Sequence, residues 1–359
     1  MNFHEARAQF PVLDRMAYLN AGSMGPLARA TVDAMSAQDR SDVEQGRGGK
    51  PYIESMRAMR ERVRTKLAAT ICVPPENLAL TSSTTAGCNI VLAGLRLGTE
   101  DEVVTTDTEH FGLIGPLHAS GATVRVAAVR AQPPEQALET ILAEITPRTR
   151  LVAISHISWQ TGNLLPVEEV QEASGVPILV DGAQSAGAVA VDASRFDFYT
   201  VSGQKWLCGP DSTGALYVRD PEGLHVALPS YFSQDRYEVS GAYTPKQGAA
   251  RFDDGWIPTA SLAGLEAAVG TIPHWAAHHS AEISARCYAQ LSDRFRVVTA
   301  PGQANLVSFV TDGNAAEIAV RAFEQGVVIR DLPGTEEWLR VSCGWWTSDG
   351  DIDRLLGAL

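Results

Sequence analysis

The sequence has few cysteines, few lysines and no long apolar run. Its five cysteines are scattered, without the paired spacing of a zinc site or a disulfide framework, so we expect reduced thiols and no metal. No stretch is apolar over the length needed to cross a bilayer. Residues 1–10 (MNFHEARAQF) lack the apolar run of a signal peptide. These absences predict a cytoplasmic protein without a membrane segment.

Positively charged residues are also few. The chain has 29 Lys and Arg against 42 Asp and Glu, which gives a net charge of −13. This balance argues against a nucleic-acid or anionic-membrane partner. The 359 residues, 45% of them hydrophobic, suffice for one large and one small domain with a sizeable core.

The scarcity of lysine makes one position conspicuous. The chain has only four lysines: Lys50, Lys66, Lys205 and Lys246. Only Lys205 directly follows a predicted strand, between two glycines; the others lie in polar helical or loop sequence. Taken alone, Lys205 would be read as a surface lysine, so its neighbours decide the interpretation.

Two β-rich apolar runs, Val176–Val180 and Phe196–Val201, precede a group of polar side chains. Short apolar runs bounded by turn residues are typical of buried parallel strands, and ligands bind beyond the carboxyl ends of such strands. The polar residues expected at that edge are Asp181, Gln184, Ser202, Gln204 and Lys205.

This set suits pyridoxal 5′-phosphate (PLP). PLP needs a lysine for its Schiff base and a carboxylate facing the pyridine nitrogen. An anion stabilises the protonated ring nitrogen, which then allows the ring to accept electrons. Lys205 and Asp181 are the natural catalytic pair.

At this point the chain resembles the class V aminotransferase group of fold type I PLP enzymes. The motifs VDGAQSAG (180–187) and SGQKWLCGP (202–210) carry the resemblance, which extends from YLNAGSMGPL (18–27) to LRVSCGWW (339–346). It implies an α/β fold with a mostly parallel, doubly wound sheet in the large domain and a smaller C-terminal αβ domain. It also implies PLP, an amino-acid substrate and a homodimer.

The resemblance assigns further roles. Ser83, Thr84 and Thr85 open a predicted helix after a strand, an arrangement that binds phosphate, although Ser and Thr also simply cap helices. His110 would stack on the cofactor ring, although a lone histidine is more often a buried or capping residue. Thr259 lies in ARFDDGWIPTAS (250–261), which resembles the family segment that reaches the partner subunit's phosphate group.

Substrate contacts are expected from both ends of the chain. Arg340 matches the family arginine that holds the substrate α-carboxylate, which suits its planar fork, although an arginine in a strand is often only ion-paired. Asn20, Ala21 and Gly22 match the N-terminal motif near the site. Trp159 stands where many relatives carry an asparagine, and either lines the pocket or packs in the core. Trp345 and Trp346 could likewise either line the pocket or pack in the core.

Three parts of the chain are predicted. Residues 1–25 form an N-terminal segment near the active site, residues 26–258 the PLP-binding domain, and residues 259–359 the small domain. Alternating strands and helices favour a doubly wound sheet. The stretch 220–255 reads as irregular and polar, and so long a loop is either functional or disordered.

The favoured reaction is C–S β-elimination from cysteine or a cysteine S-conjugate. A cysteine desulfurase needs a nucleophilic cysteine on the loop before the Arg340 strand, and RDLPGTEE (330–337) has none. Cys208 and Cys343 read as packing residues. An epimerase, a transaminase or a decarboxylating relative stays open, because the fold cannot separate these reactions. A non-enzymatic PLP-fold protein is disfavoured by the presence of both Lys205 and Asp181.

Overall fold

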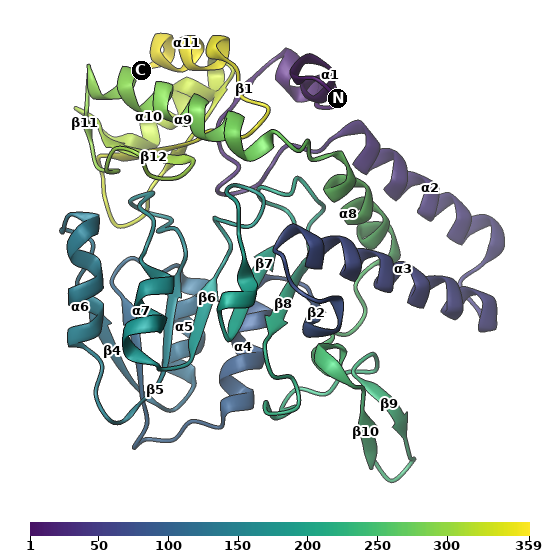
Figure 1. Ribbon diagram of the computed structural model, residues 1–359. Helices are drawn as coiled ribbons and strands as arrows, with labels where there is room; N and C mark the ends of the chain where they lie inside the picture. The colour runs from purple at the N-terminus through teal and green to yellow at the C-terminus, as the bar shows by residue number, and fades with distance from the viewer.

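A seven-stranded sheet forms the centre of the larger part of the molecule in this computed structural model, which describes residues 1–359 (Figure 1). The strand order is β2-β8-β7-β6-β5-β3-β4, and only β8 runs antiparallel to its neighbours. The strands are β2 (Leu78–Thr81), β3 (Glu102–Thr106), β4 (Thr123–Ala127), β5 (Thr149–Ser155), β6 (Ile178–Asp181), β7 (Phe198–Ser202) and β8 (Gly214–Val218). The predicted mostly parallel α/β sheet is therefore confirmed.

Both faces of this sheet are apolar because both are covered by helices. Along β6, Leu179 points to a cluster that includes α4 and α5, whereas Ile178 and Val180 point to a cluster that includes α3, α6, α7 and α8. Such two-sided burial explains the unbroken apolar runs in the sequence. The helices around the sheet are α2 (Arg29–Gln45), α3 (Gly49–Thr70), α4 (Thr84–Leu95), α5 (Phe111–Ala119), α6 (Ala137–Ala143), α7 (Val167–Ser174) and α8 (Thr259–Thr271).

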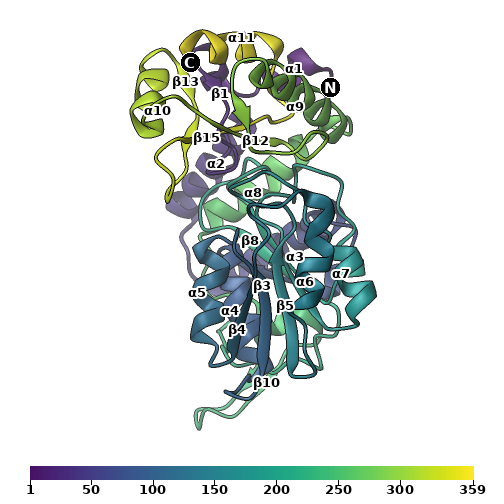
Figure 2. The same cartoon turned by 90° about the vertical axis from the view of Figure 1, so that its left-hand side faces the viewer.

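A smaller antiparallel sheet, ordered β11-β12-β15-β14, lies beyond the large sheet (Figure 2). One face of it packs on helices through a core that includes Phe309, Leu339 and Val341. Residues of the other face, Ser308 and Arg340, hydrogen-bond to the large part of the molecule. The elements here are α9 (Ala276–Ser292), β11 (Arg296–Val297), β12 (Leu306–Val310), α10 (Ala315–Glu324), β13 (Val327–Val328), β14 (Arg330–Asp331), β15 (Trp338–Ser342) and α11 (Asp349–Ala358).

The N-terminal segment packs against the small sheet and its helices. It contains α1 (Phe3–Arg7) and the two-residue strand β1 (Ala17–Tyr18), and β1 pairs in parallel with β13. Leu19 is fully buried in the same cluster as Phe309. Residues 20–25, which follow β1, are thereby held between the two sheets.

Helix α8 packs against α2 and α3, and its residues Leu262 and Leu265 belong to the core of the large sheet. The chain then breaks around Pro273 before α9 begins at Ala276. The division at residue 259 stays a prediction, and this packing favours a boundary after α8. None of the helices is long and apolar enough to cross a membrane.

The stretch 220–255, predicted to be irregular, contains a β-hairpin. Strands β9 (Gln234–Tyr237) and β10 (Tyr243–Pro245) pair antiparallel and project from the body of the molecule (Figures 1 and 2). Alternating apolar residues, the usual strand signal, are absent here because the hairpin is largely exposed. The base of the hairpin is anchored by Asp253, whose buried carboxylate accepts from Arg60 at 3.1 Å and from Arg64 at 2.9 Å.

Candidate active site

Asp181 and Lys205 lie at neighbouring carboxyl ends of the central strands. Asp181 is the last residue of β6, and Lys205 follows β7, the strand beside it. The Asp181 carboxylate is 4% exposed, and its Oδ1 accepts from the Ala183 N–H at 2.9 Å and the Thr200 hydroxyl at 3.2 Å. Its Oδ2 has no hydrogen-bond partner in the protein, so one oxygen is held and the other remains available to a ligand.

The surroundings of Lys205 favour its neutral amine. Burial lowers the pKa of Lys205 to about 8, an effect that Asp181 opposes and Arg340 reinforces. A buried ammonium is destabilised by desolvation, so its neutral amine becomes accessible near physiological pH. The same two neighbours show that Lys205, Asp181 and Arg340 share one electrostatic environment.

A second carboxylate lies beneath this edge. Glu109 follows β3, and its carboxylate accepts from the Thr106 hydroxyl at 2.6 Å and the Ser155 N–H at 3.1 Å. Ser155 is paired in register with Asp181, which places Glu109 close to that residue. Burial raises the pKa of Glu109 to about 7. The sequence analysis assigned no role to Glu109.

His110, the next residue, caps helix α5, and its Nδ1 accepts from the Gly112 N–H at 3.0 Å. Desolvation and then the Lys205 charge lower the pKa of His110. Trp159 meets the His110 ring edge-on at a centroid distance of 5.2 Å. The Nε1 of Trp159 is buried without a partner, and its indole lies beside His110, an arrangement that favours the pocket-wall interpretation.

The hydroxyl-rich turn after β2 begins helix α4. Ser83 caps the helix by accepting from the Ala86 N–H at 3.1 Å, while the side chains of Thr84 and Thr85 are half-buried. The Thr85 hydroxyl lies near Gly112, where an added Cβ would come within 2.5 Å of Oγ1. Capping by Ser83 and phosphate binding by the helix N-terminus are compatible, because the remaining N–H groups of the first turn stay free.

Gln184 and Gln204 connect the lysine loop to the N-terminal segment. Gln184 donates to the Gly22 carbonyl at 2.8 Å and accepts from Trp206 Nε1 at 3.0 Å. The Gln204 side chain accepts from the Ser202 hydroxyl at 2.8 Å, and its backbone carbonyl accepts from the Gly25 N–H at 2.8 Å. Both polar atoms of the Gln184 amide, and the amide oxygen of Gln204, are therefore bonded within the protein, which sequence spacing does not reveal.

Arg340 lies at the junction of the two sheets, on β15. The guanidinium donates to the Trp159 carbonyl at 2.8 Å and to the Ser23 hydroxyl at 3.2 Å, and its buried Nε has no partner. The side chain is only 2% exposed, yet no carboxylate lies within 4 Å of it. Burial and then Arg330, its partner across β14 and β15, lower its pKa. The unused donor capacity of this buried guanidinium makes Arg340 a candidate for binding an anion.

The N-terminal segment closes over this arginine. Gly22 approaches so closely that an added Cβ would lie 2.8 Å from Arg340 Nη2, and at Gly25 it would lie 2.1 Å from the Lys205 carbonyl oxygen. Ala21 is buried, and Asn20 has a buried Oδ1 without a partner. The predicted contacts of Asn20 and Ala21 stay predictions, while Ser23 is a neighbour of Arg340 that the site prediction missed.

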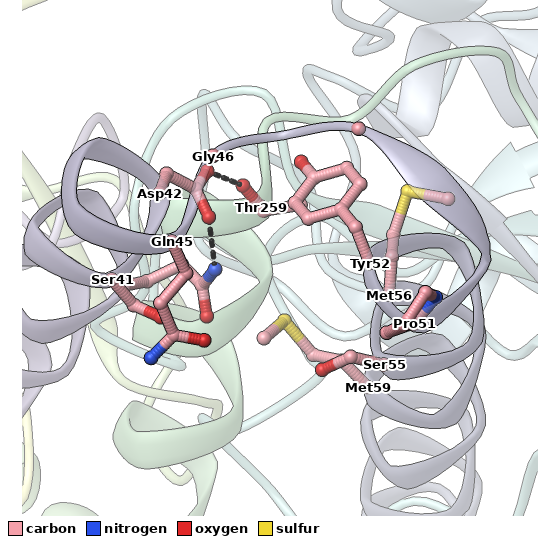
Figure 3. Close-up of a pocket in the computed structure, with 12 residues that line it drawn as sticks. Ser41, Asp42, Gln45, Gly46, Pro51, Tyr52, Ser55, Met56, Met59 and Thr259 are labelled. Carbon is pink, nitrogen blue, oxygen red and sulfur yellow. Dashed lines mark hydrogen bonds between the residues drawn. The ribbon is translucent and has the colours of Figure 1, made fainter.

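Thr259 lies apart from these residues, at the start of α8. Its hydroxyl donates to Asp42 of α2 at 3.0 Å, beside a polar cavity between α2 and α3 (Figure 3). Tyr52 lines the same cavity, and its buried hydroxyl has no partner. Within one chain, therefore, Thr259 does not lie in the same site as Lys205. If Thr259 contacts the phosphate group of a cofactor, that cofactor would be bound to a second subunit.

Trp345 and Trp346, for which the sequence left two interpretations open, are core residues. Trp345 and Trp346 are 1% and 0% exposed and pack with Phe10, at centroid distances of 5.2 and 5.7 Å. Cys208 and Cys343 are buried as well. Burial raises the pKa of the Cys208 thiol well above its usual value, and a hydrogen bond with Cys287, followed by burial, does the same for Cys343. Cys72 is exposed but precedes β2, at the opposite edge of the sheet from Lys205.

Residues 17–355 match the Aminotransferase class-V family. Isopenicillin N epimerase from Streptomyces clavuligerus is 28% identical over 100% of this chain and 98% of its own. A cysteine desulfurase from Enterobacter sp. (strain 638) is 32% identical over 74% of this chain and 70% of its own.

Solved structures of C-DES resemble this fold throughout. A lysine-to-alanine mutant of C-DES, with glycine covalently linked to its PLP cofactor, has a TM-score of 0.90 and 29% identity over 98% of both chains. The cystine C–S lyase C-DES with its product cysteine persulfide has a TM-score of 0.88 and 30% identity, covering 97% of this chain and 98% of its own.

Proposed function

Since the chain belongs to the class V aminotransferase family of PLP-dependent, fold type I enzymes, we propose that it is a C–S β-lyase. Its substrate would be cysteine or a cysteine S-conjugate, and its products a thiol, pyruvate and ammonia. The observation that carries this proposal is the absence of any exposed cysteine at the edge of the sheet that holds Lys205. The similarity to C-DES supports the same reaction.

The residues of the site fit PLP. The free oxygen of Asp181 suits the protonated ring nitrogen, the amine of Lys205 suits the aldehyde, and the first turn of α4 suits the phosphate. As the cap of α5, His110 would lie beside this group. When bound, PLP supplies an electron sink for the substrate α-carbon.

The chain's own residues would then act on the substrate. Arg340 binds the α-carboxylate, because its buried guanidinium has unused donor capacity and no acid partner. Lys205 removes the proton from the α-carbon as a general base, which its lowered pKa of about 8 favours. The Cβ–S bond breaks, the sulfur leaves as a thiol, and the aminoacrylate fragment reacts with water to give pyruvate and ammonia.

We also propose a homodimer in which Thr259 reaches the partner's phosphate site. Thr259 lies away from Lys205 in its own chain, beside an open polar cavity. Trp256, three residues earlier, is 59% exposed and stacks on Tyr231, which is 50% exposed. Exposed aromatic residues of this kind are typical of interfaces.

The cysteine content of the site tests β-elimination against desulfuration. A desulfurase transfers sulfur to an enzyme thiol, which must be exposed and reactive. We therefore expect Cys208→Ser, Cys343→Ser and the double variant to release pyruvate from a cysteine S-conjugate within several-fold of the wild-type rate. The assay measures pyruvate from the conjugate and, in a parallel incubation with L-cysteine, alanine and enzyme-bound persulfide. Loss of turnover in a variant of normal PLP content, with alanine and a persulfide on the wild-type cysteine, would establish the desulfurase instead.

A further inference from the structure

Glu109 is a buried acidic residue that the proposed mechanism does not use. It follows β3, and its carboxylate accepts from the Thr106 hydroxyl at 2.6 Å and from the Ser155 N–H at 3.1 Å. The Ser155 hydroxyl donates to the second carboxylate oxygen. All of these donors are neutral groups. Because burial of a carboxylate among neutral partners is costly, Glu109 is a candidate for a role in the site.

Ser155 connects Glu109 to Asp181. Ser155 ends β5, Asp181 ends β6, and the two residues are Cα partners in this parallel pair. Neighbouring strands lie about 4.8 Å apart, so a single strand separates the two carboxylates. The buried thiol of Cys88, on α4, faces both acids, because burial and then the charges of Asp181 and Glu109 raise its pKa. Asp181 and Cys88 are therefore the titratable groups that face Glu109.

The surroundings of Glu109 accommodate both its carboxylate and its neutral acid. The hydroxyls of Ser155 and Thr106 donate to an ionised carboxylate, and each can turn to accept from a protonated one. Burial raises the pKa of Glu109 to about 7, although the bonds from Ser155 and Thr106 oppose this rise. Glu109 therefore changes its charge near physiological pH.

We propose that Glu109 is a positioning residue for the cofactor and that it acts through Asp181. One oxygen of Asp181 is held by Ala183 and Thr200, and the other remains available to the ring nitrogen. A negative charge on Glu109 makes the electrostatic potential at Asp181 more negative, which favours a protonated ring nitrogen there. The affinity for PLP then depends on whether Glu109 is ionised. The inference rests on the proposed placement of the ring against Asp181, and not on the reaction that follows.

The affinity of the full-length apoprotein for PLP, measured at pH 6 and pH 8, tests the inference. Glu109→Gln keeps the size of the side chain and removes its charge. At pH 8, where Glu109 is mostly ionised, the variant is expected to bind PLP about three- to tenfold more weakly than the wild type. At pH 6 the two Kd values should agree within about twofold. Ser155→Ala removes a donor to the carboxylate, so it should move the pH at which Glu109 begins to strengthen binding upward.

The 1-deaza analogue of PLP, in which C–H replaces the ring nitrogen, shows whether Glu109 acts at that nitrogen. Glu109→Gln should bind this analogue as tightly as the wild type at both pH values. Asp181→Asn should weaken the binding of PLP and leave that of the analogue unchanged. Glu102→Gln is the matched control, because it neutralises another buried carboxylate, at the opposite end of β3, and it should leave both affinities unchanged.

Three results would overturn the inference. Equal Kd values for PLP in the wild type and Glu109→Gln at pH 8 would do so. A loss of the same size at pH 6 and pH 8, or an equal loss for PLP and the analogue, would show that Glu109 only supports the loop that carries His110. In each case, a loss specific to PLP in Asp181→Asn would leave the placement of the ring, and the proposed reaction, standing.

Discussion

Lys205→Ala is expected to abolish the absorption band of the lysine-bound cofactor and the turnover of the enzyme. Lys205 is the only lysine at the carboxyl edge of the sheet, beside the Asp181 strand, and no other amine there can take its place. Its pKa of about 8 makes the neutral amine available both to hold the cofactor covalently and to remove the α-proton. The loss should reach the detection limit of the pyruvate assay.

The measurement compares visible absorption and pyruvate release in purified wild type and variant. Lys50→Ala is the matched control, because Lys50 is exposed and makes only a 3.7 Å surface contact with Glu54. The control should keep both colour and activity. A Lys205→Ala protein that retained the wild-type absorption band and full turnover would show that another group holds the cofactor.

Arg340→Ala is expected to raise KM for the amino acid strongly and to leave the cofactor in place. The guanidinium is buried, has no acid partner and keeps Nε free, so the substrate carboxylate would be its anion. Loss of one member of a buried charge pair costs about 2–5 kcal/mol, roughly a factor of 30 to several thousand in KM.

The Arg340→Lys variant separates the contribution of positive charge to carboxylate binding from that of bidentate geometry, because lysine is a cation without the planar guanidinium. It should recover only part of the lost affinity. Circular dichroism and PLP content report whether loss of the contacts to the Trp159 carbonyl and Ser23 disturbs the fold. A folded, PLP-loaded Arg340→Ala enzyme with an unchanged KM would exclude Arg340 from carboxylate binding.

The sequence predicted the parts of this fold that depend on local pattern. Apolar runs marked β6 and β7, and the residues just beyond them placed Asp181 and Lys205 at one edge, because parallel strands end on the same side. The hydroxyl residues Ser83, Thr84 and Thr85 predicted the start of α4, where Ser83 accepts from the Ala86 N–H at 3.1 Å. In each case the structural signal lies within a few residues.

Features that depend on contacts between segments far apart in the sequence were not predicted. The pairing of β1 with β13, which brings Gly22 against Arg340, joins residues more than three hundred positions apart. The hairpin β9–β10 was missed because its residues are exposed and lack apolar alternation. The burial of Trp345 and Trp346 against Phe10 likewise depends on where the N-terminal segment packs.

The stoichiometry of products from a single cysteine S-conjugate tests the proposed reaction most directly. The purified holoenzyme is incubated with S-carbamoylmethyl-L-cysteine, and pyruvate, ammonia, free thiol, alanine and the D-amino acid are quantified together. β-Elimination predicts equal amounts of pyruvate, ammonia and thiol, with no alanine and no D-enantiomer. Alanine in place of pyruvate, or recovery of racemised substrate without thiol, would contradict the assignment as a C–S β-lyase.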